Sequence, residues 1–242
     1  MSPADSAALT VQDDLETLTR TAADLVVEAA SRAWDREFRV ACQADPRRAG
    51  CLTFFRRIHT DVESSGRGGA SIGLTSAWSP PIMLTVTTAS LKRSCSAECQ
   101  SRAHVHRAPV ELGTAEQVAQ AYEDELRRES SGAGNTPPVF DLVLLGMGSD
   151  GHTASLFPGK PSLTETRRWI VASTAGVLPP PVDSVTLTLP VLNATRSVVF
   201  LAAGADKRAA LNDVLSGSSV LPASRVRGAS VRWLVDRTAR GV

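Results

Sequence analysis

Apolar side chains recur at near-helical spacing close to the start of the chain. The positions are Leu15, Leu18, Leu25, Val26 and Ala29. This spacing is typical of an amphipathic helix that buries one face. Asp13 and Asp14 precede these positions, and the partial positive charge of a helix start favours acidic side chains there. We therefore expect a helix over residues 10–34, followed by a strand that begins with Phe-Arg-Val-Ala at residues 38–41.

The second half of the chain alternates between helical and strand-like patterns. A helix is expected from Thr114 to Glu129, because Thr114 and Gln117 have the spacing of a capping box. Residues 139–148 are a continuous apolar run that ends in glycines, as in a strand buried on both faces of a parallel sheet. Further strands are expected at 169–173, 185–189, 198–204 and 231–236, with a helix at 205–215 and a linker at 130–138. This alternation predicts an α/β fold, with a Rossmann-like, mostly parallel sheet flanked by helices.

Composition and charge indicate one ordinary globular unit. The chain has 242 residues, 43% of them hydrophobic, and a formal net charge of +1, which suits a single domain over residues 1–242 and no nucleic-acid partner. The first residues are polar and acidic where a signal peptide needs a basic patch and an apolar run. No apolar run approaches the length of about 18 residues that spans a membrane. We expect a cytoplasmic protein without a membrane partner, and the sequence does not indicate its oligomeric state.

The cysteines do not form a recognisable metal-binding pattern. They are Cys42, Cys51, Cys95 and Cys99, with eight and three residues between the members of each pair and no flanking histidine pair. Structural zinc sites use closely spaced ligands in a regular pattern. We therefore expect no bound metal.

Residues that suggest chemistry gather where the apolar run at 139–148 ends. Gly146, Gly148 and Gly151 follow that strand, and His152 comes directly after Asp150 and Gly151. Ligands of open α/β sheets bind beyond the carboxyl ends of the strands. Glycines also let a backbone approach an anion closely. The pattern predicts a phosphate-binding loop that holds His152 beside the bound anion, with its imidazole free to take a proton.

The segment after His152 adds two hydroxyl side chains, Thr153 and Ser155. We expect a helix to begin here, so that backbone N–H groups and these hydroxyls face the anion. Two alternatives exist. The same glycine spacing occurs in dinucleotide-binding folds, but here it lies more than halfway along the chain, without an acidic residue at the end of a recognisable next strand. His152 could also cap a helix or lie in the core, although its position at a strand end favours a site.

Three segments carry a resemblance to a known family. They are DLVLLGMGSDGHTASLFPG, VTLTLPVLNATR and VVFLAAGADKRAAL. Together they resemble the 6-phosphogluconolactonase family, over about residues 104–238 and more weakly over 10–41. The resemblance implies the fold that this family shares with glucosamine-6-phosphate deaminases. Those deaminases typically continue their loop with Asn-Gly-His-Ile and carry a Phe-Asn-Glu-Pro segment, so the SDGHTASLFPG sequence favours the lactonase branch.

The resemblance implies specific roles for several residues. His152 would be the general base that activates water against the lactone carbonyl, with Asp150 beside it. Lys207, in the family's Gly-x-x-Lys pattern, would help to hold the 6-phosphate; from its position alone it could equally be a solvated helix residue. The family usually has arginine immediately before VTLTLP, whereas this chain has Ser184, which implies weaker phosphate binding.

The implied reaction needs neither a metal nor a cofactor. A δ-lactone is an activated ester, and its hydrolysis requires a positioned base, a water molecule and donors for the developing oxyanion. The expected substrate is 6-phospho-D-glucono-1,5-lactone, a small-molecule sugar phosphate of the oxidative pentose phosphate pathway. Two other hypotheses remain: a sugar-phosphate isomerase or deaminase of the same fold, and an inactive remnant.

Residues 42–103 depart from the rest of the chain. They contain all four cysteines but only four of the 25 acidic residues: Asp45, Asp61, Glu63 and Glu98. They also lack two signatures that the resemblance implies, a Ser-Gly-Gly-Ser-Thr-Pro loop and an Asp-Glu-Arg segment. A composition shift this abrupt within one domain indicates a change of reading frame, with a divergent insertion as the alternative.

A shifted reading frame restores both signatures. Residues 41–49 can be encoded by codons in which the third base of each, joined to the first two bases of the next, forms the codons of LSGGSTPR. The same offset applied from Gly73 gives ADERMVPPDHADSNY, in which the single codons of Trp78 and Met83 still fit. Our hypothesis is that two compensating insertions or deletions, near codon 41 and near codons 101–103, shift the frame between them. Residues of this segment, including His59, are then assigned no functional role.

Overall fold

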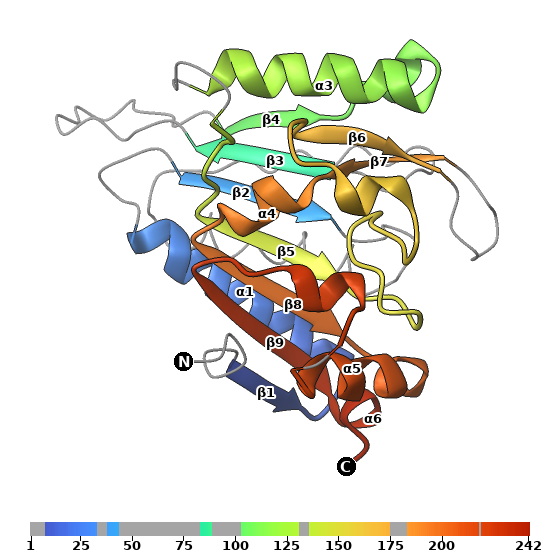
Figure 1. Cartoon of the computed structure of the whole chain (residues 1–242). Helices are drawn as coiled ribbons and strands as arrows, with labels where there is room; N and C mark the ends of the chain where they lie inside the picture. Colours follow the sequence, from blue (N-terminus) through green and yellow to red (C-terminus); the bar gives the residue numbers. More distant parts are fainter. Residues whose placement is uncertain are drawn as a thin grey trace, which may run out of the picture.

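The computed structural model describes residues 8–32, 38–43, 83–88, 103–130, 136–174, 183–217 and 219–242. A seven-stranded sheet runs through these residues (Figure 1) in the order β1-β9-β8-β5-β2-β3-β4. Its strands are β1 (Ala8–Gln12), β2 (Phe38–Gln43), β3 (Met83–Thr88), β4 (Ala103–Arg107), β5 (Leu142–Gly146), β8 (Ser197–Ala202) and β9 (Ser230–Asp236). The first five strands in this order are mutually parallel, whereas β3 and β4 are antiparallel to their neighbours. The expected mostly parallel α/β sheet is confirmed.

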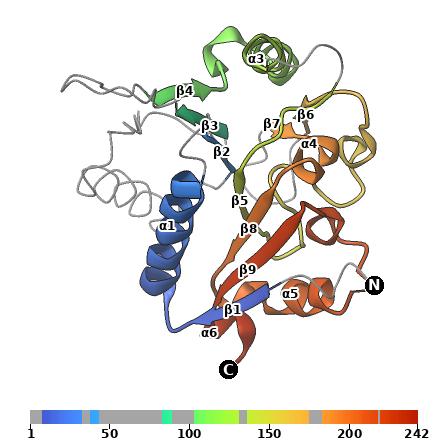
Figure 2. The same cartoon turned by 90° about the vertical axis from the view of Figure 1, so that its left-hand side faces the viewer.

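Helices cover both faces of this sheet, as Figure 2 shows. Helix α1 (Leu15–Arg32) lies on one face, and α3 (Ala115–Glu129), α4 (Leu189–Asn193) and α5 (Arg208–Leu215) lie on the other. The short α6 (Arg237–Arg240) follows β9, and four 3-10 turns complete the described elements: η2 (Val110–Leu112), η3 (Pro161–Thr164), η4 (Ala205–Lys207) and η5 (Pro222–Arg225). Strand β5 is therefore buried on both sides, which explains its uninterrupted apolar sequence.

The expected helix over residues 10–34 is wrong at its start. Residues 8–12 form β1, which pairs in parallel with β9 along the sheet edge. Its Thr10 and Val11 are β-branched and suit a strand. The hydrogen-bonding partner of this strand is β9, which the local sequence pattern could not identify. Helix α1 begins at Leu15, where the Asp14 carboxylate accepts a hydrogen bond from the Thr17 N–H at 2.7 Å. Residues 33–34 lie outside the described residues.

The strands expected at 169–173 and 185–189 do not join the main sheet. They are β6 (Ile170–Ser173) and β7 (Ser184–Leu187), which form a separate antiparallel pair. This pair packs against α3, and all four residues of β7 are buried. Apolar strand patterns indicate burial but not the partner strand, so the sequence could not separate the two sheets. Leu189 begins α4 and does not continue β7.

Several other expectations are confirmed. Helix α3 has the capping box of Thr114 and Gln117, and the expected helix at 205–215 is the 3-10 turn η4 followed by α5. The predicted linker lies partly outside the described residues, as do three of the cysteines; only Cys42, in β2, has a described backbone. Among the described residues, no helix is long and apolar enough to cross a membrane.

Candidate active site

The segment after β5 forms a compact loop at the carboxyl edge of the sheet, drawn in yellow in Figure 1. Two short backbone contacts shape it: the Gly148 N–H donates to the His152 carbonyl at 2.8 Å, and the Gly151 N–H donates to the Gly148 carbonyl at 3.0 Å. Thr153 then forms isolated bridges with Met147 and Leu156. The chain turns back on itself, and this turn presents residues 150–152 at the edge where α/β folds bind their ligands.

Asp150 and His152 form a hydrogen-bonded pair at the tip of this loop. The Asp150 Oδ1 atom lies 2.6 Å from the ring Nδ1 of His152 and 3.1 Å from its backbone nitrogen. An ionised carboxylate only accepts hydrogen bonds, so in the neutral imidazole Nδ1 is the donor and Nε2 keeps its lone pair. Both side chains are partly exposed, at 26% for Asp150 and 18% for His152. A carboxylate that orients an imidazole in this way can support general-base chemistry at Nε2.

The charge of Asp150 is maintained by the same contacts. Burial raises the pKa of the Asp150 carboxyl, but the hydrogen bonds from the ring and backbone of His152 outweigh burial and hold its pKa below the ordinary value. The carboxylate is therefore ionised at neutral pH and stabilises positive charge on the His152 ring.

Gly148 is required by the position of the His152 ring. A Cβ atom at Gly148 would lie 2.1 Å from the ring Nδ1 and 2.5 Å from the Asp150 Oδ1 atom. The Phe157 ring also packs against the imidazole, with the two ring centroids 4.5 Å apart. A glycine backbone and an aromatic ring are thus both close neighbours of the imidazole. Phe157 was not anticipated as part of the site, although it lies five residues after His152 in the same segment.

Gly146 and Gly151 have different environments. Gly151 has a φ of +75°, and a Cβ there would lie 2.6 Å from a methyl group of Leu221. Its carbonyl accepts a hydrogen bond from the Ala223 N–H at 3.1 Å. Gly146 ends β5, and a Cβ there would meet no atom of the described residues within 4 Å. Within the described part of the chain, the space beside Gly146 is therefore open, whereas the missing side chain of Gly151 allows close packing against Leu221.

No helix begins at residues 152–155, so that expectation is wrong. The segment consists of turns and isolated bridges, and the next helical turn is η3 at Pro161. Thr153 and Ser155 are 0% and 2% exposed. The Thr153 hydroxyl donates to the Gly146 carbonyl at 2.8 Å. Backbone groups that would be hydrogen-bonded within a helix are bonded across the turn instead. The N–H groups of Gly148 and Gly151 also donate to carbonyls within the loop.

Lys207 lies in the corresponding loop after β8, the strand next to β5 in the sheet. Its side chain is only 2% exposed, and its Nζ atom lies 2.9 Å from the Asp206 Oδ2 atom. A solvated helix position is therefore excluded for Lys207. The partner carboxylate is exposed, because the Asp206 side chain retains 58% of its accessible surface.

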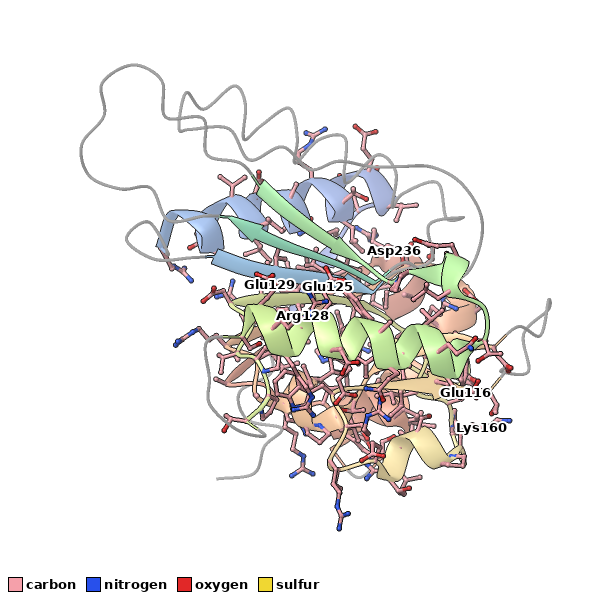
Figure 3. All side chains as sticks on the ribbon, turned by 90° about the horizontal axis from the view of Figure 1, so that it is seen from above. Glu116, Glu125, Arg128, Glu129, Lys160 and Asp236 are labelled. Carbon is pink, nitrogen blue, oxygen red and sulfur yellow. The ribbon has the colours of Figure 1, made fainter. Side chains whose placement is uncertain are left out.

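Asp236 organises the loop that carries Lys207, and the sequence did not identify it as a site residue. Its carboxylate accepts hydrogen bonds from the Gly204 N–H at 3.1 and 3.2 Å and from the Ala239 N–H at 2.7 Å. Figure 3 labels Asp236, at the end of β9, and also Lys160, near the end of the β5 loop. The sequence feature that could have identified Asp236 is its position at the end of a strand and directly before a short helix, where aspartate commonly caps the helix.

Ser184 lies at the first position of β7 and is 5% exposed. Its hydroxyl donates to the Ser173 carbonyl at 3.5 Å, across the β6–β7 pair. At the position where the resemblance implies arginine, this chain therefore has a buried serine in contact with the neighbouring strand. Among the described residues, no three His, Cys, Asp or Glu side chains gather as they would around a metal ion.

Comparison with known proteins identifies the family of the chain. Residues 85–235 match the family model of glucosamine-6-phosphate isomerases and 6-phosphogluconolactonases. The 6-phosphogluconolactonase of Rattus norvegicus is 48% identical over 127 residues, which cover 51% of this chain and 48% of the rat protein. That of Synechocystis is 40% identical over 141 residues, 57% of each protein. The match thus spans about half the length of these curated relatives.

Solved structures share the fold over nearly the whole chain. A 6-phosphogluconolactonase from Trypanosoma cruzi has a TM-score of 0.72 at 20% identity, over 100% of this chain and 97% of its own. A monomeric glucosamine-6-phosphate deaminase has a TM-score of 0.61 at 16% identity, over 97% of this chain and 99% of its own. The matched family model covers more than half of the residues. The chain therefore belongs to the family of glucosamine-6-phosphate isomerases and 6-phosphogluconolactonases.

Proposed function

We propose that the protein hydrolyses 6-phospho-D-glucono-1,5-lactone to 6-phospho-D-gluconate. The observation that carries the proposal is the Asp150–His152 pair, whose short Nδ1 contact leaves Nε2 of the imidazole as the proton acceptor. The similarity to curated 6-phosphogluconolactonases at 40–48% identity supports the same substrate. The reaction belongs to the oxidative pentose phosphate pathway, and we propose the cytoplasm as its location.

The proposed mechanism uses His152 first as a base and then as an acid. Its Nε2 atom takes a proton from water while the water oxygen attacks the lactone carbonyl carbon. The resulting tetrahedral intermediate then breaks its bond to the ring oxygen, and the imidazolium returns the proton to that oxygen. The products are a free hydroxyl and a carboxylic acid, which releases its proton to solvent at neutral pH and leaves as the carboxylate. Asp150, ionised beside the ring, stabilises the imidazolium that exists between the two steps.

The other predicted residues divide between substrate contact and support. We propose that the buried ammonium of Lys207 binds the phosphate, and that the open space beside Gly146 receives part of the sugar. Gly148 and Gly151 let the loop adopt its shape. Because the Thr153 and Ser155 side chains are buried, they would support the loop from behind.

The experiment follows lactone disappearance above the spontaneous rate. We would compare the chain with its His152→Ala variant and with a frame-restored protein that contains LSGGSTPR and ADERMVPPDHADSNY. We expect His152→Ala to abolish turnover in the frame-restored protein, and wild-type rates in that variant would remove His152 from the mechanism. Ammonia release from glucosamine 6-phosphate would indicate the deaminase alternative. Activity only after frame restoration would make the chain an inactive remnant of a lactonase.

A further inference from the structure

We infer that Thr186 and Ser173 are positioning residues, which fix the direction of the His152 ring by holding the backbone of Ser155 from both sides. The inference rests on the proposed function of His152 as a general base. It adds a role for strands β6 and β7, which lie outside the main sheet and contain neither Asp150 nor His152.

Both polar backbone groups of Ser155 are bonded to side chains of this pair. The Ser155 N–H donates to the Thr186 Oγ1 atom at 3.1 Å, and the Ser173 hydroxyl donates to the Ser155 carbonyl at 2.5 Å. Thr186 and Ser173 are 0% and 1% exposed. Water cannot easily replace either partner in such a buried place, so losing one would leave a backbone group without a partner. The two side chains therefore fix the position of Ser155 relative to β6 and β7.

Ser155 is well placed to transmit this constraint to the imidazole. It lies three residues after His152 and two before Phe157, and the rings of these two residues contact each other with centroids 4.5 Å apart. The chain between them turns tightly, since the Leu156 N–H donates to the Thr153 carbonyl at 2.9 Å. Within this turn Ala154 has a φ of +53°, in the left-handed region that non-glycine residues rarely adopt. Such a conformation persists only where its surroundings enforce it, and the contacts of Ser155 supply that enforcement.

The β6–β7 pair is itself firmly attached to α3. The Glu123 carboxylate, 1% exposed, lies 2.5 Å from the Arg168 Nε atom and accepts a hydrogen bond from the Ile170 N–H at 3.4 Å. The pair therefore offers a fixed support for the loop. Thr188, the residue after β7, donates its hydroxyl hydrogen bond to the Arg168 carbonyl at 2.7 Å and not to the Ser155 backbone, which makes it a matched control.

The test compares Thr186→Val, Thr186→Ser, Ser173→Ala and Thr188→Val in the full chain. Valine has the shape of threonine without the acceptor, whereas serine keeps it. We expect Thr186→Val to lower kcat by about 10- to 100-fold, as for a misplaced catalytic group, with KM changed by less than about twofold. Thr186→Ser should restore kcat, and Thr188→Val should leave kcat unchanged. Ser173→Ala should lower kcat as well, and it replaces Thr186→Val if that variant does not fold.

A second readout does not depend on activity. The pKa of the Asp150 carboxyl, followed by NMR of its carboxyl carbon, is held down by the hydrogen bonds from His152. It should rise in Thr186→Val and Ser173→Ala and stay unchanged in Thr188→Val. A wild-type chain without lactonase activity would count against the proposed function, and the Asp150 titration would then decide the inference alone. Unchanged kcat and an unchanged Asp150 titration in both variants, or an equal loss in Thr188→Val, would overturn it.

Discussion

The carboxylate of Asp150 accepts hydrogen bonds from both the ring and the backbone nitrogen of His152, at 2.6 and 3.1 Å. One oxygen atom thus orients the imidazole and closes the turn that carries it. Charge, orientation and loop shape therefore depend on a single ionised group, and its protonation should affect all three.

Acid should weaken the fold through this carboxylate. The pKa of Asp150 is lower in the folded protein than its ordinary value, because the hydrogen bonds from His152 outweigh burial. A carboxyl with a lowered folded pKa contributes stability above its unfolded pKa of about 4, and this contribution is lost as the pH falls through the folded pKa. We expect the difference in unfolding free energy between wild type and Asp150→Asn to shrink from pH 7 to pH 3. Urea unfolding at several pH values measures it, and a constant difference would contradict the assignment.

Substitution by alanine should lower kcat strongly at Gly148 and leave kcat nearly unchanged at Gly146. In Gly148→Ala the new Cβ would lie 2.1 Å from the His152 Nδ1 atom, so the ring must move. We expect kcat to fall by more than about 100-fold. In Gly146→Ala the new methyl meets no atom of the described residues within 4 Å, so the melting temperature and kcat should stay near wild type while KM rises if the sugar lies there. Steady-state kinetics of both variants test this contrast, and an unchanged kcat in Gly148→Ala would be incompatible with the described ring position.

Lys207 should contribute to phosphate recognition more than to chemistry. Methionine resembles lysine in length and suits the 2% exposed position, but it lacks the ammonium. We expect Lys207→Met to raise KM for the phosphorylated lactone by about 10-fold or more, and to leave the hydrolysis of unphosphorylated gluconolactone unchanged. Asp206→Asn, which keeps the ammonium and removes its partner charge, is the control. An equal effect on both substrates would show that Lys207 supports the fold and not the phosphate site.

Glu123 should be important for stability. Its buried carboxylate is bonded to Arg127 at 2.6 Å and Arg168 at 2.5 Å, and the Arg127 guanidinium lies 4.1 Å from the centroid of Trp169. Removing one charge from such a cluster costs about 3 kcal/mol. We expect this loss of unfolding free energy in Glu123→Gln. Glu116→Gln, on the exposed side of the same helix (Figure 3), should change it by less than about 0.5 kcal/mol. Denaturant unfolding distinguishes the two, and equal effects would contradict a special role for Glu123.

Local sequence patterns predicted the elements whose neighbours are close in the chain. The capping box of α3 involves Thr114 and Gln117, three residues apart, and the pairing of Asp150 with His152 spans two residues. In contrast, β1 depends on β9, more than 200 residues later, and the exclusion of β6 and β7 from the main sheet depends on α3. Apolar periodicity reports burial but not which distant element provides it.

The same distinction applies to the candidate site. The glycines, Asp150 and His152 are recognisable because they lie in one short segment. Asp236 and Thr186 act on loops 32 and 31 residues away in sequence, through hydrogen bonds that no spacing rule describes. Lys207 was found through a family pattern, but its burial became apparent only in the fold.

The reading frame of residues 42–103 is the remaining prediction. Within this segment the structure describes residues 42–43 of β2, all of β3 and residue 103 of β4, but not residues 44–82 and 89–102, so the contribution of the segment to the site rests on the nucleotide sequence. We expect sequencing of codons 35–110 on both strands to show that the shifted frame encodes LSGGSTPR and ADERMVPPDHADSNY. A frame in which these signatures are absent would make the segment a divergent insertion. If the two indels vanish on resequencing, the gene encodes both signatures in the same frame as the Asp150–His152 pair. If they persist, the Asp150–His152 pair belongs to a chain that lacks the loop expected beside the phosphate, and restoring the frame should then raise both activity and the cooperativity of unfolding.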